Sequence, residues 1–396
     1  MRICMLMFRL MPQTYRRVVV SNSIYKKYLN VDILCIKQEG QSDFENYKGV
    51  HYYRLPIHYK TGDSQFRILT KYFKFTVISF MEMVKKNTQK KYDIIHVHNP
   101  PDFFILAAIP LKWIYRTKII LDLHDMLPEA FISNLNVPEN HIFVKIAKCI
   151  ENVSILFSDA VICTNEYDKS IVLSRNHISP EKIFVVMNSP DMDILKIENG
   201  SKSALALDKK FVILFEGSIW KRRGIQTVID AVEMVKEKLP IYFLIVGDGP
   251  DIEYLQKYVD EKELQEHVRF TGWVNLKELS EYISVADICL IPFLQTKVNA
   301  RGVPNKLFEY IVHDKPVFSS NLKGIASTYN NQEITFFEPG NAKDLAEKIL
   351  WGYNNQEQLK TMTAAAKRRY YTDYTWERME KELYRCYESL NAGGKE

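Results

Sequence analysis

The feature of this sequence that most constrains its fold is a regular alternation of short apolar runs with longer amphipathic segments. Several runs are continuous stretches of Val, Ile, Leu and Phe, as expected for strands buried on both faces of a parallel sheet. Alternating strands and helices indicate βαβ units, and twelve strands are too many for one sheet. We predict strands at Arg2–Phe8, Val31–Ile36, Ile94–His98, Lys118–Leu123, Ala160–Cys163, Ile183–Met187, Phe211–Phe215, Ile241–Val246, Val268–Thr271, Ile288–Ile291, Val317–Ser320 and Ile334–Phe336.

The domain organisation follows from this alternation and from length. A chain of 396 residues has room for two or three domains of roughly 150 residues each. A polar stretch near residues 198–210 separates two groups of strands. We therefore predict an α/β fold of two Rossmann-like, doubly wound parallel-sheet domains, residues 1–190 and 200–375, facing a central cleft. Because ligands of open parallel sheets bind beyond the carboxyl ends of the strands, we expect the site in that cleft.

Composition narrows the class of protein. With 46% hydrophobic and 26% charged residues, the chain is an ordinary globular protein rather than a disordered one. Its six cysteines show no CxxC spacing, which predicts reduced thiols in a cytoplasmic protein, with no disulfide framework and no zinc site. No apolar run approaches the length of a membrane span, and we expect residues 1–8 to form a strand rather than a signal peptide.

Charge is distributed unevenly along the chain. Residues 1–91 hold 17 Lys/Arg and 6 Asp/Glu, a net +11, although the whole chain is only +5. A basic region of this kind is typical of a surface that meets phosphates. Residues 66–92 interleave lysines with apolar residues, which predicts a peripheral contact with the anionic inner face of the plasma membrane; a solvated helix face is the alternative. No motif supports a nucleic-acid partner, and we expect none.

Two loops after predicted strands are rich in glycine. The loop from Glu216 to Gly224 carries three consecutive cations, Lys221, Arg222 and Arg223, and opens onto a predicted helix. Such a loop suits a pyrophosphate, although a solvated basic turn is the alternative. Residues 246–250 contain G-x-G without the third glycine of a dinucleotide fingerprint, so we predict a tight turn there rather than an NAD site.

The segment from Arg301 to Val317 is the most informative. Pro304 suits the first turn of a helix, which places Asn305 and Lys306 at a helix N-terminus that favours an anion. Glu309 follows one turn later, where its carboxylate can accept hydrogen bonds from ligand hydroxyls. The alternative is that Glu309 pairs with a neighbouring cation.

Two patterns resemble metal sites. Asp191-Met192-Asp193 lies at the predicted interdomain turn, without a cluster of further ligands. We expect His96 and His98 to point to opposite faces of one strand and to serve packing or polar lining, not to form a ligand pair. No metal is therefore expected.

Taken together, these residues resemble glycosyltransferase family 4, the retaining, nucleotide-sugar-dependent enzymes of the GT-B fold. The resemblance covers essentially the whole length, and in that fold the last helix, here residues 376–396, returns to the N-terminal domain. The matching segments are Tyr92–Pro101, Leu123–Asp125, Phe215–Gly224, Val246–Pro250, Phe270–Val274, Ala286–Ile288, Pro304–Pro316 and Tyr374–Arg378.

The resemblance implies residue roles. Glu309 is expected to bind the donor ribose, Arg223 and Lys306 to stabilise the leaving diphosphate, and His124 to face the reacting sugar as a positioning group or general base. A core histidine is the alternative for His124. The donor-binding set is completed by Gly217, Arg222, Trp273, Val274, Arg301, Asn305 and Leu307, of which Trp273 and Val274 match the segment that cradles the base.

The sequence also departs from the family pattern. Arg301 occupies the place of the first Glu of the family's E-x7-E motif, and Ser218 that of the usual Arg. The loop at residues 9–14 lacks the usual Gly pair, and the interdomain turn is Asn188-Ser189-Pro190-Asp191 in place of Asn-Gly-Val-Asp. A related bacterial polysaccharide subset shares the Pro-x-Lys-Leu-x-Glu-Tyr sequence found here.

The expected function is therefore retaining, metal-independent transfer of a hexose from a nucleoside-diphosphate sugar to a saccharide or lipid-linked saccharide in cell-surface polysaccharide synthesis. Two alternatives are a nucleotide-sugar-binding scaffold that has lost catalysis and a UDP-sugar 2-epimerase of the same fold. The donor, the acceptor, the linkage and the oligomeric state stay open.

Overall fold

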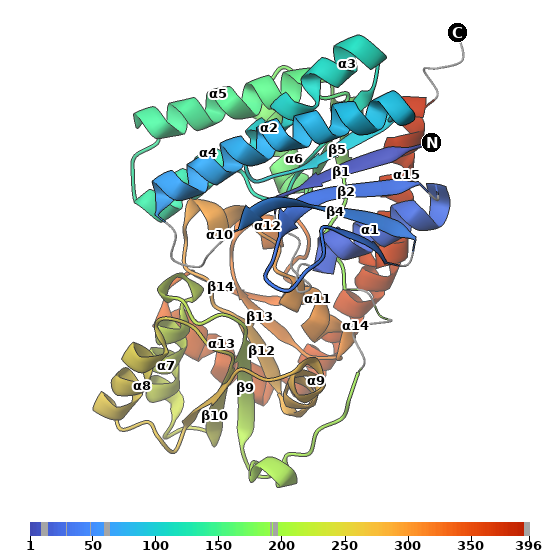
Figure 1. The fold of residues 1–396 in the computed structure, drawn as a ribbon. Coiled ribbons are helices and arrows are strands. Elements are labelled where there is room, and N and C mark those ends of the chain that lie inside the picture. The colour runs from blue at the N-terminus through green and yellow to red at the C-terminus, as the bar shows by residue number, and fades with distance from the viewer. Residues whose placement is uncertain are drawn as a thin grey trace. The chain divides into compact units, whose positions relative to one another are not determined.

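The computed structural model describes residues 1–8, 15–28, 30–47, 49–58, 64–190, 192 and 197–391. The chain divides into two compact units (Figure 1). Unit 1 comprises Met1–Met187 and Glu377–Glu396, and unit 2 comprises Asn188–Trp376. The loop at residues 9–14, Asp191 and Asp193 lie outside the described residues.

Unit 1 is built on an eight-stranded sheet in the order β3-β4-β2-β1-β5-β6-β7-β8, in which β3 and β4 pair antiparallel and the other described pairs are parallel. Its strands are β1 (Ile3–Met7), β2 (Val31–Lys37), β3 (Phe44–Tyr47), β4 (Val50–His58), β5 (Ile94–His98), β6 (Lys118–Leu123), β7 (Ala160–Cys163) and β8 (Ile183–Val185). Its helices are α1 (Tyr15–Tyr28), α2 (Gln65–Gln89), η1 (Asp102–Ala107), α3 (Ile109–Tyr115), α4 (Leu127–Leu135), α5 (Ile142–Phe157), α6 (Glu166–Arg175), η2 (Pro180–Lys182) and α15 (Trp376–Asn391).

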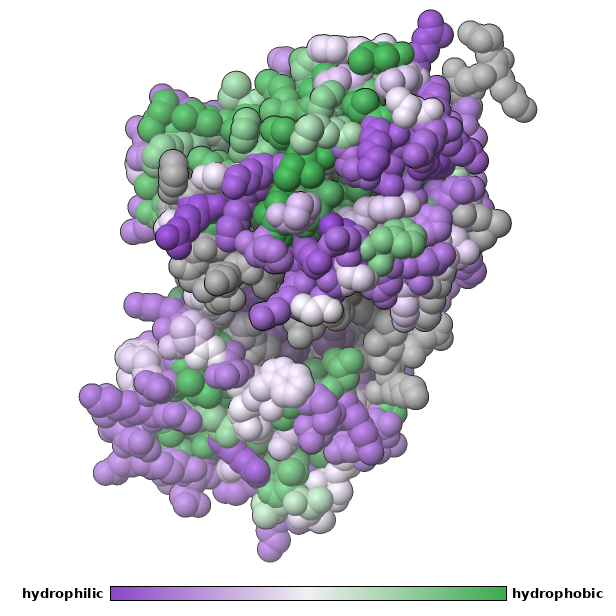
Figure 2. Space-filling view, viewed as in Figure 1, coloured by the Kyte–Doolittle hydropathy of each residue, from purple (hydrophilic) through white to green (hydrophobic). Residues whose placement is uncertain are grey.

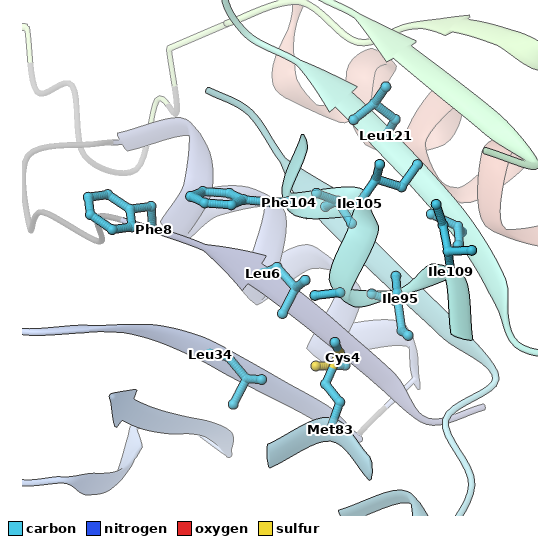
Figure 3. Close-up of a cluster of buried hydrophobic side chains, with 14 of the residues drawn as sticks. Cys4, Leu6, Phe8, Leu34, Met83, Ile95, Phe104, Ile105, Ile109 and Leu121 are labelled. Atoms are coloured by element: carbon cyan, nitrogen blue, oxygen red, sulfur yellow. The ribbon is translucent and has the colours of Figure 1, made fainter. Parts of the chain in front are cut away.

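Alternate residues of the unit 1 strands pack against α2, η1, α3 and α5 on one face of the sheet. Cys4 and Leu6 of β1 meet Met83 of α2 and Ile105 of η1 in this core (Figure 3). The opposite face packs against α15, where the Tyr387 hydroxyl lies 2.7 Å from Nδ1 of His96. Helix α15 thus belongs to unit 1 although it follows unit 2 in sequence.

Unit 2 is built on a six-stranded, wholly parallel sheet in the order β11-β10-β9-β12-β13-β14. Its strands are β9 (Phe211–Glu216), β10 (Ile241–Val246), β11 (Val268–Gly272), β12 (Ile288–Ile291), β13 (Val317–Ser320) and β14 (Thr335–Phe337). Its helices are η3 (Ser203–Leu205), η4 (Lys221–Arg223), α7 (Ile225–Val235), α8 (Ile252–Glu261), α9 (Leu276–Val285), α10 (Lys297–Arg301), α11 (Asn305–Val312), α12 (Lys323–Ala326), α13 (Ala342–Asn354), α14 (Gln356–Arg369) and η5 (Tyr370–Tyr374).

The predicted fold class is confirmed, and each of the twelve predicted strands is present with ends within two residues of the prediction. The hairpin of β3 and β4 was not predicted. Its residues alternate between buried and exposed, and Pro56 interrupts the apolar pattern, so the segment lacks the continuous run of a doubly buried strand.

Two further properties of the described residues concern disulfide bonds and membrane-spanning helices. All six cysteines are free thiols, and five of them are buried. Within the described ranges, every helix is too short or too polar to span a bilayer.

Candidate active site

In unit 2, the turn from β9 into α7 depends on two glycines with positive φ. Gly217 directly follows the strand with φ 114°, and Gly224 precedes α7 with φ 70°. A Cβ atom on Gly224 would lie 1.9 Å from the Pro292 carbonyl oxygen, so no side chain fits there. This close approach brings η4, with its three cations, to the carboxyl end of the sheet.

The neighbouring loop at residues 246–250 supports this turn. The Gly217 N–H donates to the Val246 carbonyl at 2.8 Å, and a Cβ atom on Gly247 would lie 2.2 Å from the Gly217 oxygen. Gly249 is equally crowded, because its Cβ would lie 2.2 Å from the Ile219 oxygen. These glycines pack two strand-to-helix turns together, as predicted for a tight turn.

Helix α11 brings Lys306 to the end of β9. Its Nζ donates a hydrogen bond to the Glu216 carbonyl oxygen, lies 3.7 Å from Glu216 Oε1 and sits 4.2 Å from the centre of the Phe215 ring. Burial lowers the pKa of Lys306, and the nearby Glu216 carboxylate opposes that shift. The ammonium therefore lies close to the Glu216 carboxylate and has little water around it.

Glu309 lies one turn further along α11. Burial and the Glu216 carboxylate raise the pKa of Glu309 to about 8, while Lys306 acts in the opposite direction. The Tyr310 hydroxyl accepts a hydrogen bond from the Glu216 N–H at 3.1 Å. The two carboxyl groups are therefore held near one ammonium, and the raised pKa keeps Glu309 mostly protonated near neutral pH.

Arg222 and Arg223 supply further positive charge at the same strand end. The Arg223 guanidinium lies 4.2 Å from the centre of the Phe293 ring, and Lys306 Nζ lies 5.5 Å from that ring. Burial, and then repulsion by Arg222, lowers the pKa of Arg223 to about 10. The Nε atoms of both arginines are buried without a hydrogen-bond partner among the described residues. Buried donors of this kind are satisfied by an incoming acceptor such as a phosphate.

The other predicted donor-binding residues differ in accessibility. Trp273 is 78% exposed, Val274 is half-buried and Asn305 is exposed. Arg301 is buried on α10, and Leu307 is fully buried in the core, where only its backbone can reach a ligand.

Sequence reasoning missed the roles of three residues at this site: Glu216, Phe293 and Tyr310. Glu216 carried a signal, because it is a carboxylate at the end of a predicted buried strand. Phe293 and Tyr310 carry no such signal, because they look like ordinary core residues in the sequence. Tertiary packing brings Phe293 against the cations and Tyr310 against the end of β9.

In unit 1, the prediction that His96 and His98 point to opposite faces of the strand is wrong. The two rings stack with centres 4.1 Å apart and planes 21° apart. Successive side chains of a strand alternate between faces, so residues two apart share a face. Both histidines are fully buried on the face of the sheet that packs against α15.

These histidines belong to a cluster centred on Asp122 of β6. Asp122 Oδ2 lies 3.3 Å from His98 Nδ1, 3.3 Å from His124 Nε2 and 3.6 Å from His96 Nε2. His98 Nδ1 and His124 Nε2 are 2.9 Å apart and hydrogen-bonded. The side chain of His124 alone in this cluster keeps some exposure, 13%.

The loop that carries His124 is held by Asn99. The Asn99 Oδ1 atom accepts hydrogen bonds from the His124 N–H at 2.7 Å and the Asp125 N–H at 3.2 Å. Its Nδ2 donates to Asp102 Oδ1 at 2.7 Å, and burial raises the pKa of Asp102 to about 7. The predicted catalytic histidine is therefore fixed by both its side chain and its backbone.

The cluster also contains a candidate set of metal ligands. His96, His98 and Asp122 each offer one ligand atom, and these atoms lie within 4.8 Å of one another. A metal must lie near the plane of each imidazole that binds it, whereas the rings of His96 and His98 lie in stacked planes only 21° apart. As arranged, the cluster therefore suits a hydrogen-bonded charge network better than a metal.

Comparison with known families agrees with the fold. The family model of glycosyltransferase family 4 matches residues 19–193, and the model of glycosyl transferases group 1 matches residues 210–355. Together they cover most of the chain. The protein belongs to these glycosyltransferases.

Two curated relatives extend this result. The chain is 25% identical over 260 residues to UDP-Gal:alpha-D-GlcNAc-diphosphoundecaprenol alpha-1,3-galactosyltransferase of Escherichia coli, an alignment that covers 63% of this chain and 62% of that enzyme. It is 24% identical over 301 residues to 2-deoxystreptamine N-acetyl-D-glucosaminyltransferase of Niallia circulans, covering 70% and 72%. Neither relative supports an epimerase or a scaffold without catalysis.

Solved structures show the same GT-B fold. Sucrose-phosphate synthase of Thermosynechococcus elongatus matches with a TM-score of 0.77 at 16% identity, covering 99% of this chain and all of that one. The Anabaena protein HepE, crystallised in complex with UDP, matches with a TM-score of 0.73 at 14% identity, covering 98% and 100%.

Proposed function

We propose that this protein is a retaining glycosyltransferase that moves a hexose from a nucleoside-diphosphate sugar to a saccharide or lipid-linked saccharide in cell-surface polysaccharide synthesis. The observation that carries the proposal is the group of three cations at the end of β9, two of which have buried Nε donors without partners. The family, and the Escherichia coli relative whose acceptor is a saccharide on diphosphoundecaprenol, support it.

Unit 2 binds the donor in this proposal. Breaking the bond from the sugar C1 to the diphosphate oxygen places negative charge on the diphosphate. Arg223 and Lys306 are already desolvated, and with Arg222 beside Arg223 they are positioned to stabilise that charge, which is the condition for strong electrostatic catalysis. With this positive charge supplied by the chain, the reaction needs no metal. The complex of HepE with UDP supports a nucleoside diphosphate as the leaving group.

The rest of the donor is recognised around the same strand end. Glu309 accepts hydrogen bonds from the ribose hydroxyls, and the exposed Trp273 with Val274 offers a surface for the base. Gly217 lets the chain approach the diphosphate closely, and Asn305 and the backbone of Leu307 lie in the first turn of α11. Arg301, buried on α10, takes the place of a carboxylate near the donor sugar.

Unit 1 binds the acceptor, and His124 faces the reacting sugar. Asp122 and His98 contact one ring nitrogen of His124 and so orient its ring to position the sugar. In the retaining reaction, the acceptor oxygen bonds to C1 on the face that the diphosphate leaves, and the departing phosphate takes the hydroxyl proton. Residues 66–92 face an anionic membrane on its cytoplasmic side, where a lipid-linked acceptor is found.

The test is a thermal-shift screen of UDP-, GDP- and ADP-sugars, followed by transfer assays with the donor that stabilises the protein. Arg223→Ala and Glu309→Ala should each lower turnover strongly, while Arg269→Ala, an exposed arginine of β11, should leave it unchanged. Equal turnover in Arg223→Ala and Arg269→Ala would remove the diphosphate role. Donor binding without transfer to any acceptor would favour the scaffold.

A further inference from the structure

Helices α2, α3 and α5 of unit 1, together with η1, carry an unusual concentration of exposed apolar side chains. Of the 21 large hydrophobic side chains exposed among the described residues, 12 lie on these four elements. The other nine are spread over the rest of both units. Soluble proteins scatter such residues singly, so a concentration of this size marks an interaction surface.

Helix α2 is apolar on two sides. Met83 and Phe75 are buried in the core of unit 1. Leu69, Phe73 and Met81 are all more than half exposed, and Val77 between them is 40% exposed. These four residues are spaced four apart and therefore form one stripe along the outer side of the helix.

Helix α5 repeats this arrangement. Its inner side buries Val144, Ala147 and Ile155. Its outer side exposes Ile142, Ile146, Val153 and Leu156, which follow helical spacing with Cys149 between them. A surface helix normally buries one apolar side and exposes a polar one, yet the outer side of α5 exposes this apolar stripe as well.

The exposed residues form one continuous surface. Both α2 and α5 pack against η1, which exposes Leu106. Trp113 of α3 meets the Phe157 ring at the end of α5 edge-on, with centres 5.9 Å apart, and Trp113 and Ile114 are each 68% exposed. Figure 2 shows apolar side chains gathered over α2 and α5 with hydrophilic ones beside them. We call the outer sides of α2, η1, α3 and α5 the docking surface.

The charge of the docking surface identifies its partner. Among the described side chains of α2, α3 and α5, every exposed charged residue is basic: Arg67, Lys74, Lys85, Lys145 and Lys148. The two acids of these helices are turned to internal pairs, Glu82 half-buried at 3.6 Å from Lys86 and Glu151 buried at 2.5 Å from Arg175. A second copy of the chain would bring the same positive charge, so self-association is opposed, whereas an anionic bilayer supplies both negative charge and an apolar phase.

We propose that the docking surface binds anionic lipid bilayers, with the apolar stripes of α2 and α5 and the Trp113–Ile114 pair inserted at the level of the headgroups. Because no helix in the described ranges can span a bilayer, the association is interfacial. The proposal extends the contact beyond residues 66–92 to α3 and α5 and makes apolar insertion, in addition to charge, a source of the affinity. It does not depend on transfer chemistry, so it stands or falls separately from the proposed activity.

The experiment is co-sedimentation of the full-length protein with vesicles of phosphatidylcholine alone or of phosphatidylcholine mixed with phosphatidylglycerol, at low and high salt. Wild type should bind the mixed vesicles and bind phosphatidylcholine much more weakly. Trp113→Ser with Ile114→Ser should weaken binding to mixed vesicles about tenfold or more through lost apolar burial. Lys145→Glu with Lys148→Glu should weaken it mainly at low salt, where charges are least screened.

Matched controls come from exposed positions of unit 2. Met234→Ser with Leu276→Ser removes exposed apolar area, and Lys257→Glu with Lys277→Glu reverses exposed charge; both should bind as wild type does. Thermal unfolding checks that each variant is folded. Failure of wild type to sediment with anionic vesicles at low salt would overturn the proposal. So would unchanged binding by the Trp113/Ile114 variant, or a wild-type dimer that this variant converts to a monomer.

Discussion

At the end of β9 in unit 2, Arg223 and Lys306 lie near Glu216 with Arg222 beside Arg223, and the two arginines keep buried donors without partners among the described residues. At the ends of β5 and β6 in unit 1, the carboxylate of Asp122 is instead surrounded by three imidazoles, which are charged only when protonated. Both groups bury charge at the carboxyl ends of parallel strands, but only unit 2 leaves positive charge in excess.

We interpret this difference in charge as a difference in role: the group in unit 2 binds an anion, and the group in unit 1 positions a side chain. Excess buried positive charge is costly until an anion arrives, so the site in unit 2 gains most when a diphosphate binds and when negative charge develops on it. The cluster in unit 1 contains its own counter-charge and hydrogen bonds, so it can hold His124 in one orientation before any ligand is present. The predictions below test whether the two groups behave in these two ways.

The largest effect is expected for Lys306→Met. This change removes a cation from the proposed diphosphate site and leaves Glu216 and Glu309 near each other without their ammonium. We expect kcat/KM for the donor to fall by about 10²- to 10³-fold in a transfer assay.

Lys315→Met is the matched control for that variant. Lys315 is a second buried lysine of unit 2, and its Nζ donates to the carbonyl oxygens of Ser284 and Ala286 at 2.6 and 3.0 Å. We expect it to lower the thermal stability and leave donor kinetics near those of wild type. Equal kinetic losses in the two variants would mean that Lys306 is only structural.

The second effect concerns Asp122→Asn, which keeps the shape of the side chain but removes the charge at the centre of the histidine cluster. If the cluster positions His124, kcat should fall about 10- to 100-fold with little change in the KM for the donor. Asp168→Asn is the control, because Asp168 is a buried carboxylate of unit 1 hydrogen-bonded to Thr164 and Asn165 at the start of α6. A rise in donor KM without a change in kcat would contradict the proposal that unit 2 binds the donor while the cluster in unit 1 positions His124.

The strands whose ends carry the cations of unit 2 and the histidine cluster of unit 1 could be predicted from the sequence. A strand buried on both faces has a continuous apolar sequence, which can be recognised without knowing its tertiary contacts. Lys306 and Glu309 could be placed because Pro304 and Pro316 bracket a short helix between strands, and α11 runs from Asn305 to Val312. The partners of these residues follow from packing between elements far apart in sequence. Phe293 beside Arg223, and Tyr387 beside His96, have no local signal.

The error at His96 and His98 has a different cause. The information was present in the sequence, since residues two apart on a strand share a face. Applied correctly, this period would have placed both rings beside each other, and Asp122 on the neighbouring predicted strand would have been the natural partner. The β3–β4 hairpin was missed because half of its residues face solvent, so it lacks the run that identifies the other strands.

The third prediction uses pH. Burial and Glu216 raise the pKa of Glu309 to about 8, well above its ordinary 4.5. Between these values the folded protein keeps a proton that the unfolded chain releases, so this group's contribution to stability is complete below about pH 4.5 and is lost as pH rises through about 8. Glu309→Gln should therefore flatten the fall in melting temperature between pH 5 and pH 8, which thermal unfolding at several pH values measures, and lower donor affinity about tenfold. An unchanged pH slope in this variant would contradict the raised pKa.

The smallest effect is expected for Tyr387→Phe on α15. The variant leaves the buried Nδ1 of His96 without the hydroxyl that lies 2.7 Å away, and it should cost about 1–3 kcal/mol of unfolding free energy. Tyr384→Phe is the control, because its hydroxyl donates to the Ser23 carbonyl at 2.9 Å on the same helix, outside the cluster. If α15 acts on His124 only through the packing of His96, both variants should keep kcat within about threefold of wild type and differ in stability alone. A large loss of kcat confined to Tyr387→Phe would instead mean that the hydrogen bonds from Tyr387 to His124 act as one unit, so that the cluster of unit 1 is as sensitive as the cations of unit 2.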